Sequence, residues 1–282
     1  MSPAPTVSEL EVPGPDVPVP CRLYSPHGEP EGSLVWAHGG AFAWGDLDMP
    51  EAHAVSSWLA AHGWLVLSVD YRLAPEPPTS VPSRPPGGHP FPAAHRDVIA
   101  AFDWMVARAR EHGIDRVFLG GASAGANLAA GAATALRDRG AATPAGLVLA
   151  YPLLHAAIPA PAPATAPDLE DIPRDRAFPP ELVRAFNLNY VADDESLLTD
   201  PRVYPGEGDV AGLPPTIIVN SQWDDLRPSG ERFAEQLEAA GVPVECSFEP
   251  DTFHGHLDVP EGEGFARTLA TFLVWLRAGA SR

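Results

Sequence analysis

The sequence predicts an α/β protein in which a mostly parallel β-sheet is covered on both faces by helices. Short apolar, β-prone segments alternate with segments of helical spacing along most of the 282 residues, and this alternation is typical of strand–helix–strand units. Residues 64–70 form a nearly continuous apolar run, as expected for a strand buried on both faces of a parallel sheet. Right-handed crossovers between such strands place helices on both faces.

The chain begins with a predicted hairpin and then alternates strands and helices. Residues 6–12 and 17–24 alternate apolar and polar side chains around a proline-rich turn, which is tolerated at the edge of a sheet. Further strands are expected at 33–37, 64–70, 115–119, 145–151, 215–220 and 242–249, and helices at 50–62, 93–112, 127–136, 229–240 and 263–278. Several of these helices stop at a glycine. No linker is visible, so residues 1–282 are expected to form one domain.

Two longer segments carry no predicted structure. Residues 73–92 are rich in proline, and residues 155–180 are dominated by alanine and proline. Because long structureless connections are rare in compact domains, the second segment is predicted to act as a lid or cap, extending over residues 155–200. The alternative is a plain solvated linker.

The composition excludes several classes of function. The formal net charge is −19, and all 18 basic residues are arginine, so lysine chemistry and a nucleic-acid or membrane partner are not expected. The two cysteines, Cys21 and Cys246, lie far apart and are expected to be buried thiols. The first residues lack the charge and apolar core of a signal peptide, so a cytoplasmic location is expected.

The stretch around Ser123 predicts a nucleophile. It reads Gly-Ala-Ser-Ala-Gly between a β-prone run and a helix-forming run, which is the setting of the G-x-S-x-G nucleophile elbow. Small residues allow the turn to be tight, and the following helix directs its N-terminal amides at the serine. The alternative is a glycine-rich turn with an incidental serine.

A serine needs a base and an acid, which follow it in chain order on this kind of sheet. After the last predicted strand, His254 is the favoured base, and His256 is the other candidate. The two histidines could instead bind zinc, but no third ligand has suitable spacing. Asp224 and Asp225 follow the preceding strand. One would orient the histidine, and the other would be solvated or cap the helix expected from Ser229.

An oxyanion hole is expected from backbone amides of small residues. His38, Gly39, Gly40 and Ala41 follow a predicted strand, so their amides can approach a substrate closely. The amide of Ala124, next to the nucleophile, would complete the hole. His38 is interpreted as a structural residue and not as a second base.

Several motifs together resemble the hormone-sensitive-lipase family of α/β-hydrolase esterases. They are HGGAF from His38, SVDYRLAPE from Ser68, FPAA from Phe91 with Asp97, GASAG, DDLR from Asp224, and FHG from Phe253. The resemblance implies the α/β-hydrolase fold with an eight-stranded sheet. It also implies esterase activity on small or medium acyl esters and a Ser123–Asp224–His254 triad. The sequence departs from the family at Ala41, which replaces a glycine, and at Ala122, which replaces an aspartate. The N-terminal cap helices of the family are expected to be reduced or absent.

The sequence therefore predicts a serine carboxylic-ester hydrolase that forms an acyl-enzyme on short or medium acyl esters without cofactor or metal. A fairly open pocket is expected, lined by Phe42, Trp44 and Tyr190. A thioesterase, lactonase, acyltransferase or cyclase would use the same acyl-enzyme, and a non-catalytic ligand-binding protein could share the fold. The expected partner is a small-molecule ester, and self-association into a homodimer stays open.

Overall fold

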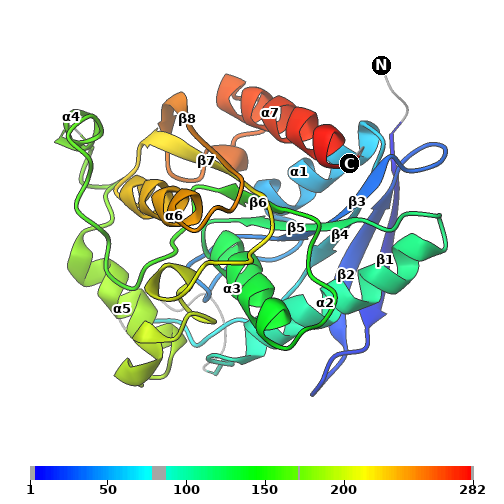
Figure 1. Ribbon diagram of the computed structural model, residues 1–282, viewed down its shortest axis with the longest axis horizontal. Helices are drawn as coiled ribbons and strands as arrows, with labels where there is room; N and C mark the ends of the chain where they lie inside the picture. Colours follow the sequence, from blue (N-terminus) through cyan, green and yellow to red (C-terminus); the bar gives the residue numbers. More distant parts are fainter. Residues whose placement is uncertain (1–3, 78–86, 171, 281–282) are drawn as a thin grey trace.

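The computed structural model describes residues 4–77, 87–170 and 172–280, and it contains one eight-stranded sheet (Figure 1). The strand order is β1-β2-β4-β3-β5-β6-β7-β8. The strands are β1 Thr6–Val12, β2 Val19–Ser25, β3 Gly32–Ala37, β4 Trp64–Val69, β5 Val117–Ala122, β6 Leu147–Ala150, β7 Thr216–Trp223 and β8 Val244–Phe253. β2 pairs antiparallel with β1 and with β4, and all other pairs are parallel. The predicted α/β-hydrolase fold is confirmed.

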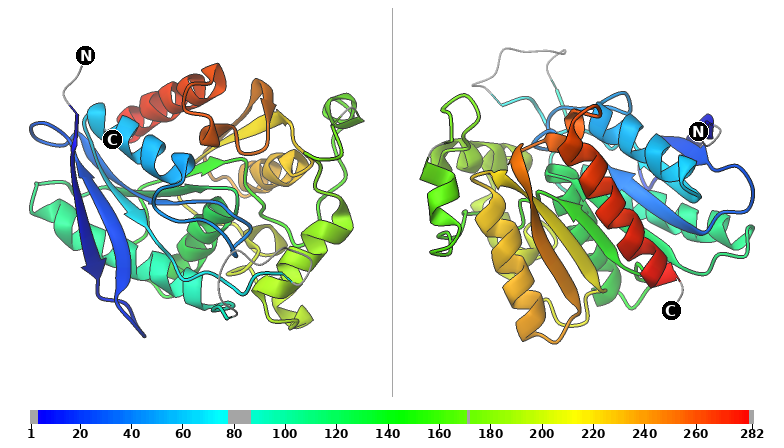
Figure 2. Two further views of the ribbon diagram at one scale, coloured as in Figure 1. Left: turned by 180° about the vertical axis from the view of Figure 1, so that it is seen from behind. Right: turned by 90° about the horizontal axis from the view of Figure 1, so that it is seen from above.

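Helices pack on both faces of the sheet (Figure 2). They are α1 Pro50–Ala61, α2 Ala93–Arg110, α3 Ala124–Asp138, α4 Ala166–Glu170, α5 Pro180–Tyr190, α6 Arg227–Ala239 and α7 Glu263–Ala280, with 3₁₀ turns η1 Glu195–Thr199, η2 Pro205–Glu207 and η3 His256–Asp258. One apolar layer contains Phe102 of α2, Leu128 of α3 and Phe233 of α6. The other contains Leu59 of α1 and Phe272 of α7. Among the described residues, no helix is long and apolar enough to cross a membrane.

The structure departs from the sequence prediction mainly in the segment 155–200. This segment contains α4, α5 and η1, where only a loop was expected up to residue 180. α5 buries Val183, Asn187 and Tyr190, which are four and three residues apart, so a helical pattern was present at the end of the proline-rich run. Part of the other proline-rich loop, residues 78–86, lies outside the described residues.

The two cysteines lie in different surroundings. Cys21 is buried as expected, whereas Cys246 is exposed. The Sγ atom of Cys246 accepts a hydrogen bond of 3.6 Å from Asn220 Nδ2. The expectation of two buried thiols was therefore wrong for Cys246, because β8 is the edge strand of the sheet and leaves much of its length exposed.

The parallel strands bring distant segments together at their carboxyl ends. β3 is followed by His38, β5 by Ser123, β7 by Asp224 and β8 by His254. Because these strands are parallel, their carboxyl ends lie at one edge of the sheet, where α/β proteins bind their ligands. The fold therefore gathers the predicted functional residues in one place.

A buried ion pair fixes α2 to the chain that leaves β4. Asp97 of α2 is fully buried, and its carboxylate accepts hydrogen bonds from the backbone N–H of Arg72 (2.9 Å) and from its guanidinium Nη2 (2.8 Å). The exposed Asp16 also contacts this guanidinium. Removing Asp97 would leave the largely buried guanidinium with only the exposed Asp16 as a partner, which is destabilising.

We expect Asp97→Ala to lower the free energy of unfolding by about 3 kcal/mol, or Tm by roughly 5 °C. Differential scanning calorimetry measures this change. Asp103→Ala is the matched control, because Asp103 lies on the same helix and pairs with Arg139 at the surface. Asp103→Ala should lower the free energy of unfolding by less than about 1 kcal/mol. Equal losses of Tm in the two variants would contradict this assignment.

Candidate functional site

Ser123 occupies a tight turn between β5 and α3. Its backbone has φ 52° and ψ −117°, a conformation that residues other than glycine rarely adopt. A Cβ atom on Gly125 would lie 2.2 Å from the carbonyl oxygen of Ala37, so the turn can only approach β3 with glycine at that position. Ser123 is also the residue from which α3 begins, and the helix N-terminus favours negative charge there.

His254 connects Ser123 to Asp224. Its Nε2 atom is 2.9 Å from Ser123 Oγ, and its Nδ1 atom is 2.8 Å from Asp224 Oδ2. With Nδ1 protonated, the ring donates to the aspartate and accepts from the serine hydroxyl. The rings of Phe178 and Tyr151 contact the imidazole edge-on, with centroids 4.8 and 4.9 Å away. The structure therefore brings together the three residues predicted as a triad.

The two adjacent aspartates have different partners. Asp224 is 1% exposed, and its second oxygen accepts the N–H of Leu226 at 2.9 Å. Asp225 accepts the N–H of Phe178 at 2.7 Å. The expectation that the second aspartate is solvated or caps a helix at Ser229 was wrong, because α6 begins earlier and this carboxylate holds the 155–200 segment.

The surroundings of His254 favour its charged form. Burial lowers the pKa of His254, but the negative charge of Asp224, its hydrogen bond and the carboxyls of Glu51 and Asp258 together raise that pKa above its ordinary value. An imidazolium formed at this position is therefore stabilised.

His256 has a structural setting. Hydrogen bonds join its Nδ1 atom to Ser221 Oγ (2.9 Å) and its Nε2 atom to Thr268 Oγ1 (2.8 Å). Burial is the largest cause that lowers the pKa of His256 to about 3. Because both ring nitrogens have protein partners, this geometry favours neither a second base nor the zinc site considered from the sequence.

The predicted oxyanion loop contains one amide that is not free. The N–H of Gly39 donates to Glu51 Oε1 at 2.5 Å, so the expectation that Gly39 contributes to the hole was wrong. Within the described residues, no such bond is found for the amides of Gly40, Ala41 and Ala124. Gly40 and Ala41 have φ angles of 105° and 48°, which reverse the chain beside Ser123. These three amides remain the candidate donors.

His38 has the structural role expected for it. Its ring stacks on Tyr71 with centroids 4.3 Å apart. Its Nδ1 atom hydrogen-bonds to the carbonyl oxygen of Gly39 at 2.7 Å. The Tyr71 hydroxyl donates to the carbonyl oxygen of His38 at 2.9 Å. His38 therefore stabilises the loop and lies buried away from the serine.

A narrow cavity of about 30 Å³ lies at Ser123. It is lined by Ala41, Phe42, Ser123, Ala124, Leu153, Phe178, Val183, Phe186 and Leu226. Phe42 lines this cavity, as predicted for the substrate pocket. The same prediction was wrong for Trp44 and Tyr190, which do not line it. Tyr190 stacks behind Phe42 at a centroid distance of 3.9 Å, and Trp44 contacts the ring of Phe186 edge-on at 5.6 Å. Leu153, Val183 and Leu226 of this lining were not predicted from the sequence.

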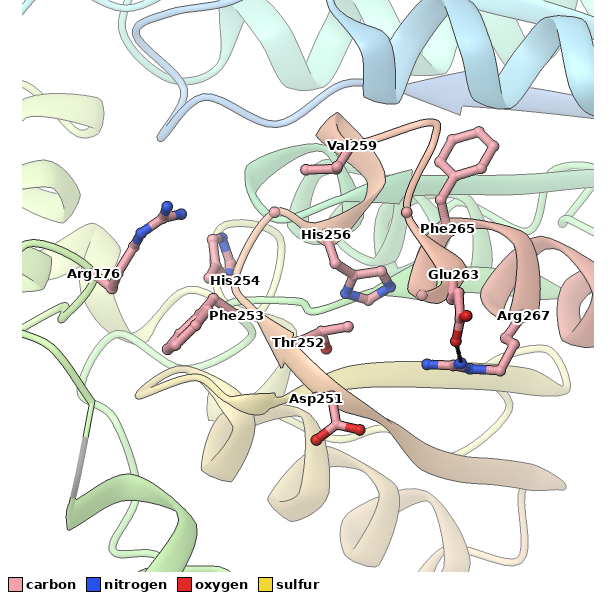
Figure 3. Close-up of a pocket in the computed structure, with 13 residues that line it drawn as sticks. Arg176, Asp251, Thr252, Phe253, His254, His256, Val259, Glu263, Phe265 and Arg267 are labelled. Carbon is pink, nitrogen blue, oxygen red and sulfur yellow. Dashed lines mark hydrogen bonds and ion pairs between the residues drawn. The ribbon is translucent and has the colours of Figure 1, made fainter.

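A second cavity, of about 420 Å³, lies on the other side of the His254 loop. Figure 3 shows Arg176 and Phe253 close to His254 at one end, and Glu263 with Arg267 at the other. Arg176 lies over the Phe253 ring at 5.6 Å. The sequence offered no signal for this cavity, because its walls come from the 155–200 segment, β8 and α7.

Comparisons with known proteins identify relatives of this chain in sequence and in structure. A family described by the alpha/beta hydrolase fold matches residues 34–258. Carboxylesterase NlhH of Mycobacterium tuberculosis is 35% identical over 252 residues, covering 85% of this chain and 72% of the relative. An acetyl-hydrolase of Streptomyces hygroscopicus is 33% identical over 250 residues, covering 86% and 75%. The thermostable carboxylesterase EstE1, cloned from a metagenomic library, superposes with TM-score 0.84 at 27% identity, covering 99% of this chain and 91% of that one.

The raised pKa of His254 predicts how the reactivity of Ser123 depends on pH. The base accepts the serine proton only when neutral, so reactivity is present above the pKa of His254 and is lost as pH falls through it. Because that pKa is raised, the midpoint should lie above 6.5. The measurement is the rate at which a fluorophosphonate labels Ser123 between about pH 5 and pH 9.

Asp224→Asn provides the comparison for this profile. It removes the charge that contributes most to raising the pKa of His254, so the midpoint should move to lower pH and the rate should fall. A flat profile in the parent protein, or an unmoved midpoint in the variant, would contradict the assignment.

Proposed function

The chain belongs to the hormone-sensitive-lipase family of α/β-hydrolase esterases and is a serine carboxylic-ester hydrolase, and we propose that it acts on short acyl esters through an acyl-enzyme on Ser123. The observation that carries this proposal is the chain of two hydrogen bonds, 2.9 and 2.8 Å long, from Ser123 through His254 to Asp224. Hydrogen-bonded serine, histidine and aspartate form the arrangement that activates a serine hydroxyl.

Each group has a defined part in the proposed reaction. His254 Nε2 takes the proton as Ser123 Oγ attacks the ester carbonyl carbon, and Asp224 stabilises the imidazolium that forms. The amides of Ala124, Ala41 and Gly40 donate to the oxyanion of the tetrahedral intermediate. His254 then protonates the departing alcohol. A water molecule, deprotonated by the same ring, attacks the acyl-enzyme and releases the acid.

The size of the cavity supports a preference for short acyl groups. About 30 Å³ beside Ser123 has room for only a few water-sized groups. Phe178, Val183 and Phe186 close it from the 155–200 segment, which we therefore propose acts as a cap. The named activity of the Streptomyces acetyl-hydrolase agrees with an acetyl-sized acyl group.

We place the alcohol part of the ester on the opposite side, in the larger cavity. His254 protonates the leaving alcohol, and this ring lines the cavity of about 420 Å³. The Phe253 ring and the guanidinium of Arg176 provide an aromatic and a cationic surface there. A small acyl group and a larger alcohol are the substrate features that this arrangement favours.

Two expectations from the sequence, a homodimer and a cytoplasmic location, stay predictions. β8 is the edge strand of the sheet and pairs only with β7. Phe248, on this edge, is 42% exposed. A second copy could therefore pair along β8 in a homodimer, because an exposed edge strand offers unpaired backbone groups. The cytoplasmic location likewise rests on the sequence alone.

The nucleophile assignment predicts that Ser123→Ala loses hydrolysis of p-nitrophenyl acetate. The expected loss in kcat is on the order of 10⁶, because no other group can form the acyl-enzyme. Ser196→Ala is the control, since Ser196 is exposed in η1, and it should keep the parent rate. Circular dichroism checks that both variants fold. A tenth of the parent rate in folded Ser123→Ala would refute the assignment.

The cavity predicts that Phe186→Ala admits longer acyl groups. Removing this ring opens the wall opposite Ser123, and each additional buried CH₂ is worth about 0.8 kcal/mol, or roughly fourfold in kcat/KM. Because butanoate has two more CH₂ groups than acetate, the ratio of kcat/KM for the butanoate ester to that for the acetate ester should rise about fifteenfold. Phe248→Ala, at the distant β8 edge, should leave the ratio unchanged. An unchanged ratio in Phe186→Ala would mean that another wall limits acyl length.

A further inference from the structure

Glu51 is a carboxyl group buried behind the oxyanion loop. It is 2% exposed and lies in the first turn of α1. Its Oε1 atom accepts the N–H of Gly39 at 2.5 Å, and its Oε2 atom accepts the hydroxyl of Tyr151 at 2.8 Å. The backbone of Glu51 is also fixed, because its N–H donates to Asp258 Oδ1 at 3.2 Å and its carbonyl oxygen accepts Trp36 Nε1 at 2.8 Å. The side chain therefore has little freedom to move.

We propose that Glu51 is a positioning residue for the oxyanion hole, an inference that rests on the proposed esterase function. By holding the Gly39 N–H on the side of α1, its carboxyl group determines how the following peptide units are turned. Those units carry the amides of Gly40 and Ala41, which are two of the candidate oxyanion donors.

The packing around Gly39 leaves the loop almost no alternative position. A Cβ atom on Gly39 would lie 2.4 Å from Glu51 Oε1 and 3.1 Å from the Cβ atom of Ser123. The residue is thus wedged between the carboxyl group and the nucleophile turn. A displacement of Glu51 would therefore act on the backbone beside Ser123.

The second oxygen of Glu51 connects the same carboxyl group to the base. The Tyr151 ring, which Glu51 holds by its hydroxyl, contacts the imidazole of His254 edge-on. Asp258, which accepts the Glu51 N–H, lies in η3 just after the His254 loop. Glu51 therefore contacts the loop that carries the candidate oxyanion donors and, through Tyr151, the imidazole ring that transfers the proton.

An amide can replace the carboxyl group in this role. Burial and the nearby Asp258 raise the pKa of Glu51 to about 7, against the opposing effects of Tyr151, Gly39 and His254. Whether the group is charged or neutral, an oxygen is available to the Gly39 N–H. A glutamine keeps that oxygen, whereas a methionine of similar size does not.

The test compares Glu51→Gln with Glu51→Met. Loss of one oxyanion donor costs about 10²- to 10³-fold in kcat, so misplaced donors in Glu51→Met should lower kcat by roughly tenfold to a hundredfold. KM for p-nitrophenyl acetate should stay within about threefold, since the hole acts mainly on the transition state. Glu51→Gln should keep kcat within about fivefold of the parent. Affinity for an arylboronic acid, which forms a tetrahedral adduct on Ser123, should fall in Glu51→Met by a similar factor to kcat/KM.

Tyr151→Phe separates the two oxygens of Glu51. It removes only the bond to Oε2, so kcat should fall by less than in Glu51→Met. The proposal is overturned if Glu51→Met changes only Tm, if it raises KM at unchanged kcat, or if Glu51→Gln is as impaired as Glu51→Met. The proposal is also overturned if Tyr151→Phe lowers kcat as much as Glu51→Met does. Fluorophosphonate labelling of the parent protein at Ser123 is the separate readout, since its absence would refute the proposed function and not the role of Glu51.

Discussion

The close approach of two backbone turns is the constraint on which the site depends. The turn at Ser123 lies against the carbonyl groups at the end of β3, and glycine at position 125 makes this contact sterically feasible. The loop after β3, like Ser123, turns through residues with positive φ. This backbone contact therefore brings the nucleophile close to the loop that carries the candidate oxyanion donors. A strained turn of this kind persists only because the surrounding sheet and helices over-determine it.

Buried carboxyl groups give the site its electrostatic character. Asp224, Glu51 and Asp258 together raise the pKa of His254 against the effect of its burial. The small cavity beside Ser123 is lined mostly by apolar side chains. Charge that develops during the reaction thus meets fixed partners in a region that excludes most water, where electrostatic interactions are stronger than in bulk solvent.

Much of this arrangement was predictable from the sequence because it depends on local patterns. Apolar runs identified the buried strands, and the glycines around Ser123 identified the turn. The direction of the Gly39 amide was not predictable, because it is set by a carboxyl group on the next helix. Trp44 and Tyr190 were expected in the pocket as large apolar residues of nearby segments. They pack behind its lining because α5 supplies Val183 and Phe186 instead. Such long-range contacts leave no periodic signal in the chain.

The hydrogen bond between Asp225 and Phe178 links the 155–200 segment, proposed above as a cap, to the loop that carries Asp224. Asp225 is covalently adjacent to the aspartate that orients His254, so the segment over the cavity is attached within one residue of the triad. This attachment constrains how the enzyme can be recombined with its relatives. An exchanged 155–200 segment must present a backbone N–H at the position of Phe178, whatever its other side chains are. Exchange of that segment together with the loop that carries both aspartates would preserve the pairing, and it defines the natural unit for building chimeric enzymes on this fold.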